Sequence, residues 1–333
     1  MSEVPNHIII SRTDSIGDVV LTLPMCGRIK STWPNCKITF LGRGYTQGII
    51  EACAHVDEFM NWDEMKHQSP AQQLETIEAC DADVIIHVFP RKEILWLAKK
   101  ARIPMRICTG HRLHALTKCN KLVFFSRKNS DLHEAQLNFK LLRPLGISDD
   151  VALSEIPGLY GFKATSPIPA FAVSLLKQHS TKRNIILHPL SKGSAAEWSL
   201  THYAELIEQL PADRFHVYIT GTAEEGERVR GSISLNHPHV TDLTGKLTLS
   251  ELISFIGACD TLVAASTGPL HIASASGIHA IGLFSPKRPI HPGRWSPIGI
   301  KARVICATSH PKKGEQLSIS TDQVLQAIMS ASK

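Results

Sequence analysis

Apolar runs alternate with amphipathic stretches along the whole chain, a pattern typical of parallel strands connected by helices. The run 7–11 is the first of these predicted strands, and it leads into a short polar loop. In the first half of the chain, strands are expected at 7–11, 37–42, 83–88 and 105–109, with a weaker one near 122–125. Helices are expected at 18–33, 70–80, 91–102 and 131–145.

The alternation of predicted strands and helices is interrupted after residue 146 and resumes at residue 184. Periodicity is lost over 147–183, where Ser166-Pro167-Ile168-Pro169 breaks it further and a single helix is expected near 170–179. Strands are expected again at 184–189, 215–219, 239–242, 261–264 and 280–283. Helices are expected at 200–210, 223–234, 249–257 and 269–276. We therefore predict an α/β protein with two Rossmann-like, doubly wound domains that face each other across a cleft.

Length and composition agree with two domains. The chain has 333 residues, of which 43% are hydrophobic and 20% charged, as in soluble globular proteins. Its eight cysteines are scattered without the spacing of a zinc site, so we expect free thiols and no metal. The N-terminal residues carry an acid and no basic stretch, so we expect no signal peptide and a cytoplasmic protein.

Charge is distributed unevenly. Between Arg91 and Arg143 there are thirteen Lys or Arg and three acids, a net charge of +10 within a chain whose total is +6. This segment predicts an anionic partner such as a phosphorylated sugar or an anionic lipid surface. Nucleic acid is the weakest candidate, because no nucleic-acid-binding motif accompanies the charges. A solvated helix face is the plain alternative for about half of these side chains.

The loop after the first predicted strand is the best candidate for chemistry. Gly17 permits a tight turn, and Asp18 follows it at the start of a helix. Because ligands bind at the carboxyl edge of open parallel sheets, Asp18 lies where a reaction would occur. The alternative is that Asp18 only caps the amides of its own helix.

Three loops of the second half also follow predicted strands, and we interpret them as one site. The first contains Ser191 and Lys192, and the second contains Gly221 and Glu225, a carboxylate able to bind a ribose diol. In the third, residues 266–271 lead into a helix whose free amides would bind a diphosphate. Helix capping is the alternative for each loop taken alone.

Several common enzyme classes lack their signatures here. The chain contains no Gly-x-Gly-x-x-Gly fingerprint, no Walker A loop and no Gly-x-Ser-x-Gly elbow. Dinucleotide oxidoreductases, P-loop phosphotransferases and α/β-hydrolases are therefore disfavoured.

The remaining motifs resemble one family over essentially the full length. They are Arg12 with Gly17-Asp18 and Pro24, His188-Pro189 with Trp198, Gly221 with Glu225, and Ser266-Thr267-Gly268-Pro269-Leu270-His271. The helix with His133-Glu134 and Asn138, before Leu145-Gly146, adds to them. Together they resemble glycosyltransferase family 9, the ADP-heptose:lipopolysaccharide heptosyltransferases.

The resemblance implies a GT-B fold. It suggests an acceptor domain at 1–165, a nucleotide-sugar domain at 166–318, and a C-terminal helix within 319–333 that returns to the first domain. The expected reaction is an inverting, metal-independent transfer, without a cofactor, of heptose or a related sugar from ADP-heptose to a lipopolysaccharide core or other surface glycan. The acceptor would be an anionic glycolipid or oligosaccharide, reached by peripheral contact with the inner membrane.

The resemblance also implies roles for individual residues. Asp18 would be the general base, and Arg12, Arg91 and Arg112 would contact the anionic acceptor. Taking the strand-end loops and our own hypothesis below together with the resemblance, we expect donor-binding residues from four loops: Ser191, Lys192, Glu225, Ser266, Thr267, Gly268, His271, Lys287 and Arg288.

Three donor-side positions depart from the family pattern. Ala196 replaces a common lysine, Ser266 an Asp, and Ser285-Pro286-Lys287-Arg288-Pro289 a Gly-Pro-Thr-Asp-Pro turn. Our hypothesis is that Lys287, Arg288 or Lys192 makes the missing phosphate contact. The alternatives are a degenerate, non-catalytic nucleotide-sugar-binding protein and a nucleotide-sugar 2-epimerase of the same fold.

Overall fold

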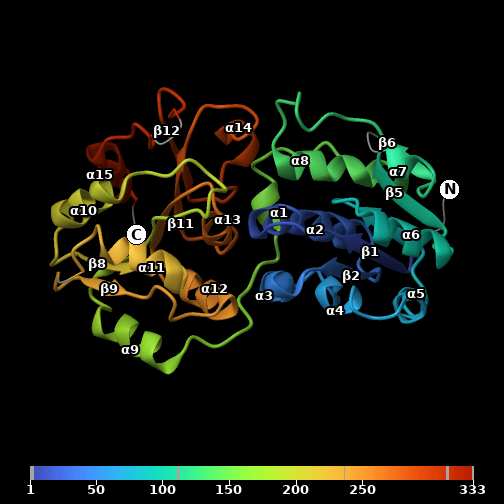
Figure 1. Cartoon of the computed structure of the whole chain (residues 1–333), viewed down its shortest axis with the longest axis horizontal. Coiled ribbons are helices and arrows are strands. Elements are labelled where there is room, and N and C mark those ends of the chain that lie inside the picture. Colours follow the sequence, from blue (N-terminus) through green and yellow to red (C-terminus); the bar gives the residue numbers. More distant parts are fainter. Residues whose placement is uncertain (1–3, 111–112, 236, 313–314, 332–333) are drawn as a thin grey trace. The chain divides into compact units, whose positions relative to one another are not determined.

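The computed structural model describes residues 4–331 apart from 111–112, 236 and 313–314. The chain divides into two compact units, Met1–Lys163 and Ala164–Lys333 (Figure 1). Each unit is built around its own parallel sheet, so the two are described separately.

The sheet of the first unit has the strand order β3-β2-β1-β4-β5-β6, with every pair parallel. Its strands are β1 (His7–Ser11), β2 (Lys37–Gly42), β3 (Glu58–Asn61), β4 (Val84–His87), β5 (Met105–Thr109) and β6 (Lys121–Val123). The chain order reverses between β1 and β4. In an open parallel sheet, the loops that follow such a pair diverge and leave room for a ligand.

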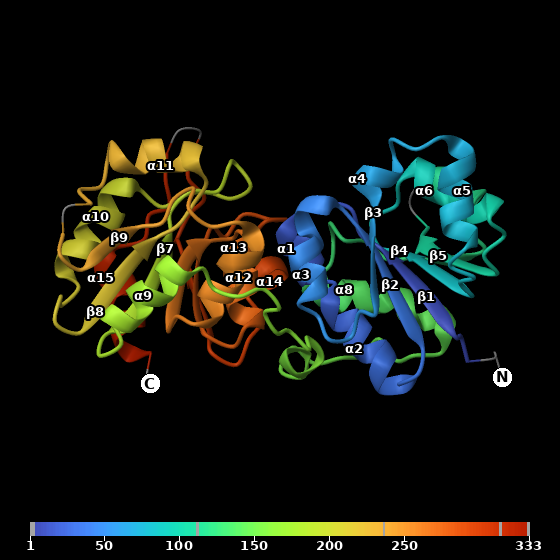
Figure 2. The same cartoon turned by 90° about the horizontal axis from the view of Figure 1, so that it is seen from below.

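Helices cover both faces of this sheet. They are α1 (Ile16–Val20), α2 (Leu23–Thr32), α3 (Gln47–Glu51), α4 (Trp62–Met65), α5 (Pro70–Glu78), α6 (Lys92–Lys100), α7 (Leu113–Leu116) and α8 (Glu134–Phe139), with 3₁₀ turns η1 (Gly44–Thr46), η2 (Lys140–Leu145) and η3 (Ile156–Leu159). Figure 2 shows α5 and α6 on one face and α2 and α8 on the other. On the first face, Ile9 and Ile85 of the central strands pack with Ile77 of α5 and Ile94 of α6.

The helix expected at 18–33 is broken in two, which corrects the sequence prediction. Pro24 lies in the first turn of α2 and has no amide hydrogen with which to continue the hydrogen bonds of α1. At the break, the Thr22 hydroxyl donates to the carbonyl of Asp18 at 2.8 Å. The Asn138 amide donates to the carbonyl of Leu21 at 3.0 Å. The short helix α1 therefore ends within a hydrogen-bonded network that includes α8.

The second unit repeats the arrangement, with strand order β12-β11-β10-β7-β8-β9 and every pair parallel. Its strands are β7 (Arg183–His188), β8 (Phe215–Ile219), β9 (Val240–Asp242), β10 (Thr261–Ala265), β11 (His279–Phe284) and β12 (Ala302–Cys306). Its helices are α9 (Ala170–Gln178), α10 (Leu200–Gln209), α11 (Ala223–Arg230), α12 (Leu249–Gly257), α13 (Gly268–Ala275), α14 (Pro292–Trp295) and α15 (Thr321–Ser330). Counted from the first strand of each unit, both sheets run 3-2-1-4-5-6, so the prediction of two Rossmann-like, doubly wound units is confirmed.

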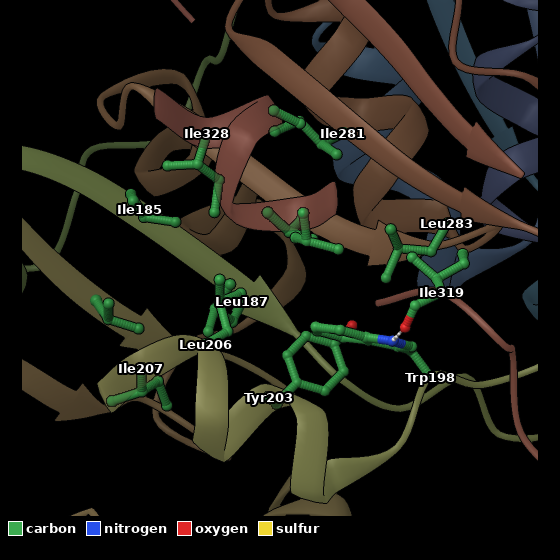
Figure 3. Packing of buried hydrophobic residues seen from close by; sticks show 14 of the residues in the cluster. Ile185, Leu187, Trp198, Tyr203, Leu206, Ile207, Ile281, Leu283, Ile319 and Ile328 are labelled. Atoms are coloured by element: carbon green, nitrogen blue, oxygen red, sulfur yellow. Dashed lines mark hydrogen bonds between the residues drawn. The ribbon is translucent and has the colours of Figure 1, made fainter. Parts of the chain in front are cut away.

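The C-terminal helix α15 is part of this second unit. Its Ile328 belongs to the same buried cluster as Leu187 of β7 and Leu206 of α10 (Figure 3). The Trp198 indole also donates to the carbonyl of Ile319 at 2.8 Å, which attaches the segment before α15 to the same core. The apolar side of α15 is therefore buried within the core of the second unit.

Candidate functional site

In the first unit, the loops that follow β1 and β4 lie side by side at the carboxyl edge of the sheet. The amide of Val88 donates to the carbonyl of Ser11 at 3.0 Å. The Arg91 guanidinium reaches across to the carbonyl of Thr13 at 3.0 Å and lies over the Phe89 ring at 5.5 Å from its centre. The loop 12–18, which contains the candidate residues, therefore lies at the place in the sheet where the chain order reverses, between β1 and β4.

A buried arginine organises this edge. The Arg12 guanidinium is only 3% exposed, and each of its nitrogens has its own acidic partner. Nε lies 2.7 Å from Asp14, Nη2 is bonded to Asp18, and Nη1 lies 3.5 Å from Glu134. Burial alone would lower the pKa of Arg12, but the three carboxylates more than offset this and raise it. Arg12 therefore remains a cation and fixes the positions of three acids.

Asp18 accepts hydrogen bonds on both carboxylate oxygens. One oxygen is bonded to Arg12, and the other accepts from the hydroxyl of Ser15, the residue just before α1. The side chain is 19% exposed, so part of the carboxylate reaches solvent. Asp18 is thus held in place by two donors while part of its side chain stays open to solvent.

Asp14 is a further carboxylate at the same edge, and the sequence analysis did not select it. Burial and the nearby negative charge of Asp18 raise its pKa to about 6, although Arg12 acts in the opposite direction. Its backbone carbonyl accepts a hydrogen bond from the Tyr45 hydroxyl. In the sequence, only the spacing of Asp14 from Arg12 and Asp18 could have pointed to it, and this spacing is uninformative until the fold is known.

Helix α8 supplies the far side of the network. Glu134 is 1% exposed and is bonded to Arg127 as well as to Arg12. Asn138, one helical turn later, accepts from Arg127 at 3.0 Å and from Arg12 at 3.3 Å. The sequence identified this helix as a motif, but its role in holding Arg12 was visible only in the structure.

The three arginines predicted to contact the acceptor do not all lie in the same surroundings. Arg12 is brought together with Asp18, but its nitrogens are engaged by protein groups rather than directed to solvent. Arg91 lies on the neighbouring loop and is bonded to Thr13. Arg112 lies outside the described residues.

In the second unit, the predicted donor residues come together at one edge. They follow the neighbouring strands β8, β7, β10 and β11, whose carboxyl ends all point the same way. Thr267 precedes α13 and is 6% exposed, and its hydroxyl has no hydrogen-bond partner among the described residues. Gly268 begins α13, and His271, 2% exposed, lies at the end of its first turn. A buried, unpaired hydroxyl beside free helix amides suits an anionic ligand.

The loop after β7 is shaped by its own side chains. Glu197 accepts from the amide of Ser191 at 2.8 Å and from its hydroxyl at 2.9 Å. Lys192 has φ 49°, a left-handed conformation that is unfavourable for a residue other than glycine. The Ser191 hydroxyl is thus used to build the loop, while the exposed Lys192 side chain is presented at its tip.

Glu225 and His188 each contact another residue of the protein and are not simply directed at a ligand. One oxygen of Glu225 caps its own helix, accepting from the amide of Thr222 at 2.8 Å. His188 lies 3.0 Å from the Thr220 hydroxyl, and burial lowers its pKa to about 4 although Glu225 opposes the shift. The capping alternative is therefore realised for Glu225, with its second oxygen left for another partner.

The segment after β11 contains an unexpected contact. Lys287 Nζ lies 3.3 Å from His310 Nε2, and the other ring nitrogen of His310 lies 2.6 Å from the hydroxyl of Ser285. Lys287 and Arg288 are both exposed. Lys287 is therefore held at this edge by His310, a residue that no motif indicated.

The described residues contain no group of three or more His, Cys, Asp or Glu that could hold a metal ion. None of the described helices is long and apolar enough to cross a membrane.

Comparison with known proteins identifies the family. The model of glycosyltransferase family 9 (heptosyltransferase) matches residues 75–322. The chain belongs to glycosyltransferase family 9. It is therefore a heptosyltransferase-like glycosyltransferase, as the resemblance of its motifs predicted.

Relatives of this family 9 chain extend over nearly its whole length. A Haemophilus influenzae protein described as a glycosyltransferase is 28% identical over 96% of this chain and 95% of its own. The lipopolysaccharide core heptosyltransferase OpsX of the same organism is 21% identical over 87% and 82%. The structure of Escherichia coli ADP-heptose lipopolysaccharide heptosyltransferase II matches with a TM-score of 0.74 at 18% identity, covering 98% of each chain. The predicted GT-B fold class is confirmed.

Replacing Arg12 by alanine is expected to destabilise the first unit by about 3–5 kcal/mol, because buried Glu134 and its neighbouring carboxylates would lose a shared cation. Denaturant unfolding at neutral pH would measure the change. Arg43→Ala is the matched control, since Arg43 is 38% exposed and 3.1 Å from Asp63, and removing such a surface pair costs under about 1 kcal/mol. Equal effects of the two substitutions would contradict the central role of Arg12.

Proposed function

We propose that this family 9 glycosyltransferase moves a heptose, or a closely related sugar, from ADP-heptose to an anionic sugar of a lipopolysaccharide core or related surface glycan. The observation that carries the proposal is the carboxylate of Asp18, fixed by buried Arg12 at the carboxyl edge of a parallel sheet and still partly exposed. The names of two relatives support this donor and acceptor. One is a lipopolysaccharide core heptosyltransferase and the other an ADP-heptose lipopolysaccharide heptosyltransferase.

Asp18 acts in this proposal as the general base. The acceptor hydroxyl gives its proton to the Asp18 carboxylate while its oxygen attacks the anomeric carbon of the donor sugar. The bond from that carbon to the diphosphate breaks, and the nucleoside diphosphate leaves with the electron pair. Attack from the opposite side inverts the anomeric configuration. Arg12 keeps the base in position, whereas Arg91 and Arg112 are the proposed contacts to the acidic acceptor.

The donor diphosphate is stabilised in this proposal by residues of the second unit. Thr267 offers a buried hydroxyl with no partner among the described residues, next to the amides at the start of α13. Lys287, Arg288 or Lys192 supplies positive charge to the diphosphate. The free oxygen of Glu225 binds the ribose, and the chemistry needs no metal because these groups balance the charge of the leaving diphosphate.

The protein is proposed to work on the cytoplasmic side of a membrane, which it contacts peripherally. Helix α6 supports this through Trp96, which is 39% exposed and has Lys100 Nζ 5.6 Å from its ring centre. Lys99 on the same side of the helix reaches the carbonyl of Thr117 at 2.9 Å, next to Leu116, which is 44% exposed. Exposed aromatic and aliphatic side chains among lysines suit an anionic bilayer surface.

Asp18→Asn should lower turnover by about 10²–10⁴-fold, because the amide keeps the shape of the carboxylate but cannot accept the proton. Transfer from ADP-heptose to a core-oligosaccharide acceptor would be measured, with ADP affinity as the control that should not change. Full turnover in this variant would reject Asp18 as the base. Release of free sugar or epimer from donor alone would favour the epimerase alternative.

Replacing Lys287 and Arg288 together by alanine should weaken ADP binding by more than about tenfold, which corresponds to about 1.4 kcal/mol of lost phosphate attraction. Titration calorimetry would measure it. Arg214→Ala is the control, because Arg214 is exposed and lies just before β8, at the opposite edge of the same sheet. An unchanged affinity in the double variant would leave the phosphate contact to other residues.

We expect the protein to bind vesicles that contain anionic lipid through Trp96 and Lys100 of α6. Salt should weaken this binding, because it screens the attraction between the lysines and the lipid charges. The double substitution Trp96→Ser and Lys100→Gln should reduce co-sedimentation several-fold. Phe171→Ser serves as the matched control, since Phe171 is 45% exposed in the second unit. If the control lost binding as strongly as the α6 variant, this helix would not be the contact surface.

A further inference from the structure

Asp14 and Asp18 share one guanidinium through different nitrogens. Arg12 Nε lies 2.7 Å from Asp14, and Nη2 is bonded to Asp18. Both carboxylates are similarly buried, with side chains 20% and 19% exposed. The positive charge of Arg12 is therefore divided between two acids of one short loop, in addition to Glu134 behind it.

The two acids differ in how their own charge is supported. Asp18 accepts from Arg12 on one oxygen and from Ser15 on the other. Asp14 accepts from Arg12 on Oδ1, and no described side chain donates to its Oδ2. Both donors hold the Asp18 carboxylate, and Asp14 competes for one of them, the Arg12 guanidinium.

We propose that Asp14 is a positioning residue for proton transfer, whose carboxylate competes with Asp18 for Arg12 and so keeps Asp18 basic enough to accept the acceptor's proton. The inference deepens the proposed function and rests on it. Asp14 itself takes no proton from the substrate. It acts through the Arg12 guanidinium, which faces both carboxylates.

The charged groups around Asp14 make its competition with Asp18 for Arg12 dependent on pH. Asp14 faces Arg12 of its own loop and Asp18 of α1, and the Tyr45 hydroxyl donates to its carbonyl with Arg43 over the Tyr45 ring. Beyond Arg12, the charge of Glu134 is balanced by Arg127. Among these acids, Asp14 has its pKa raised to about 6. Below that pH, a neutral Asp14 leaves more of the Arg12 charge to Asp18.

The test compares the pH profile of turnover in the full chain with Asp14→Asn and Asp14→Glu. Wild-type kcat is expected to fall as pH is lowered through about 6, because Asp14 then loses its charge. Asp14→Asn should be roughly 10- to 100-fold slower at pH 8, because Arg12 is then shared with one acid fewer, and should lack this step. Asp14→Glu, which keeps the charge, should restore both the step and most of kcat. The acceptor KM and ADP affinity should stay within about threefold.

A stability measurement separates this role from simple misfolding. Because folding raises the pKa of Asp14, its contribution to stability is complete below the unfolded value of 3.8 and is lost as pH rises through about 6. Asp14→Asn, which mimics the neutral acid, should therefore have a higher Tm than wild type at pH 7.5. The difference should shrink toward pH 4. A slower but more stable variant is the expected result.

Failure of this inference can be told from failure of the proposed function. If Asp18→Asn keeps full turnover, the proposed base is wrong and Asp14 has nothing to position. If Asp18→Asn is inactive while Asp14→Asn shows wild-type kcat and an unchanged pH profile, only the inference about Asp14 is overturned. Loss of kcat that Asp14→Glu does not restore would overturn it as well, because the charge would then not be the cause.

Discussion

The buried guanidinium of Arg12 sets the conditions for the whole carboxyl edge of the first sheet. Removing a cation from water costs several kcal/mol unless acids surround it, and here three carboxylates do so. These acids come from the loop after β1, from α1 and from α8, so one charge ties three elements together. Asn138 completes the link, since it bonds both Arg12 and the carbonyl of Leu21 at the end of α1. The position of the candidate base is therefore a consequence of satisfying a buried charge.

The same topology serves both units, but their edges are built differently. In the first unit, the loops at the β1–β4 reversal are held by ion pairs around Arg12. In the second, the loops after β7 and β8 are held by carboxylates that accept from nearby backbone amides, Glu197 from Ser191 and Glu225 from Thr222. An edge rich in carboxylates suits proton removal, whereas an edge with free amides and exposed cations suits a diphosphate.

The repeated strand pattern was predictable because central strands are continuous apolar runs, as in β1 and β7, whose residues are almost all buried. The edge strands β3 and β12 were missed because they are short and half-exposed, with no such run. The break before α2 was visible in Pro24 but was overridden by the apolar periodicity around it. Local patterns thus predicted the fold class well and the ends of elements less well.

The sequence located the two strand-edge regions correctly but not how charges are shared within them. Asp18 and the residues around Thr267 were selected because each lies just after a predicted strand, whereas Arg12 was selected through the family resemblance. Asp14 and Arg127 were not selected, since their importance comes from contacts with residues elsewhere in the chain, such as Glu134.

Some strained features of the molecule occur at these same two edges, although Asp81 and Arg102, at φ 46° and 54°, lie elsewhere. Asp14 is held in a site that disfavours its charge, Lys192 adopts φ 49°, and the buried Thr267 hydroxyl lacks a partner among the described residues. Each of these reduces stability, and none is needed to form the parallel sheets, which rest on apolar packing. Residues that disfavour folding persist where they serve a ligand or a reaction. Asp14, Lys192 and Thr267 at the carboxyl edges therefore fit the function proposed for both edges.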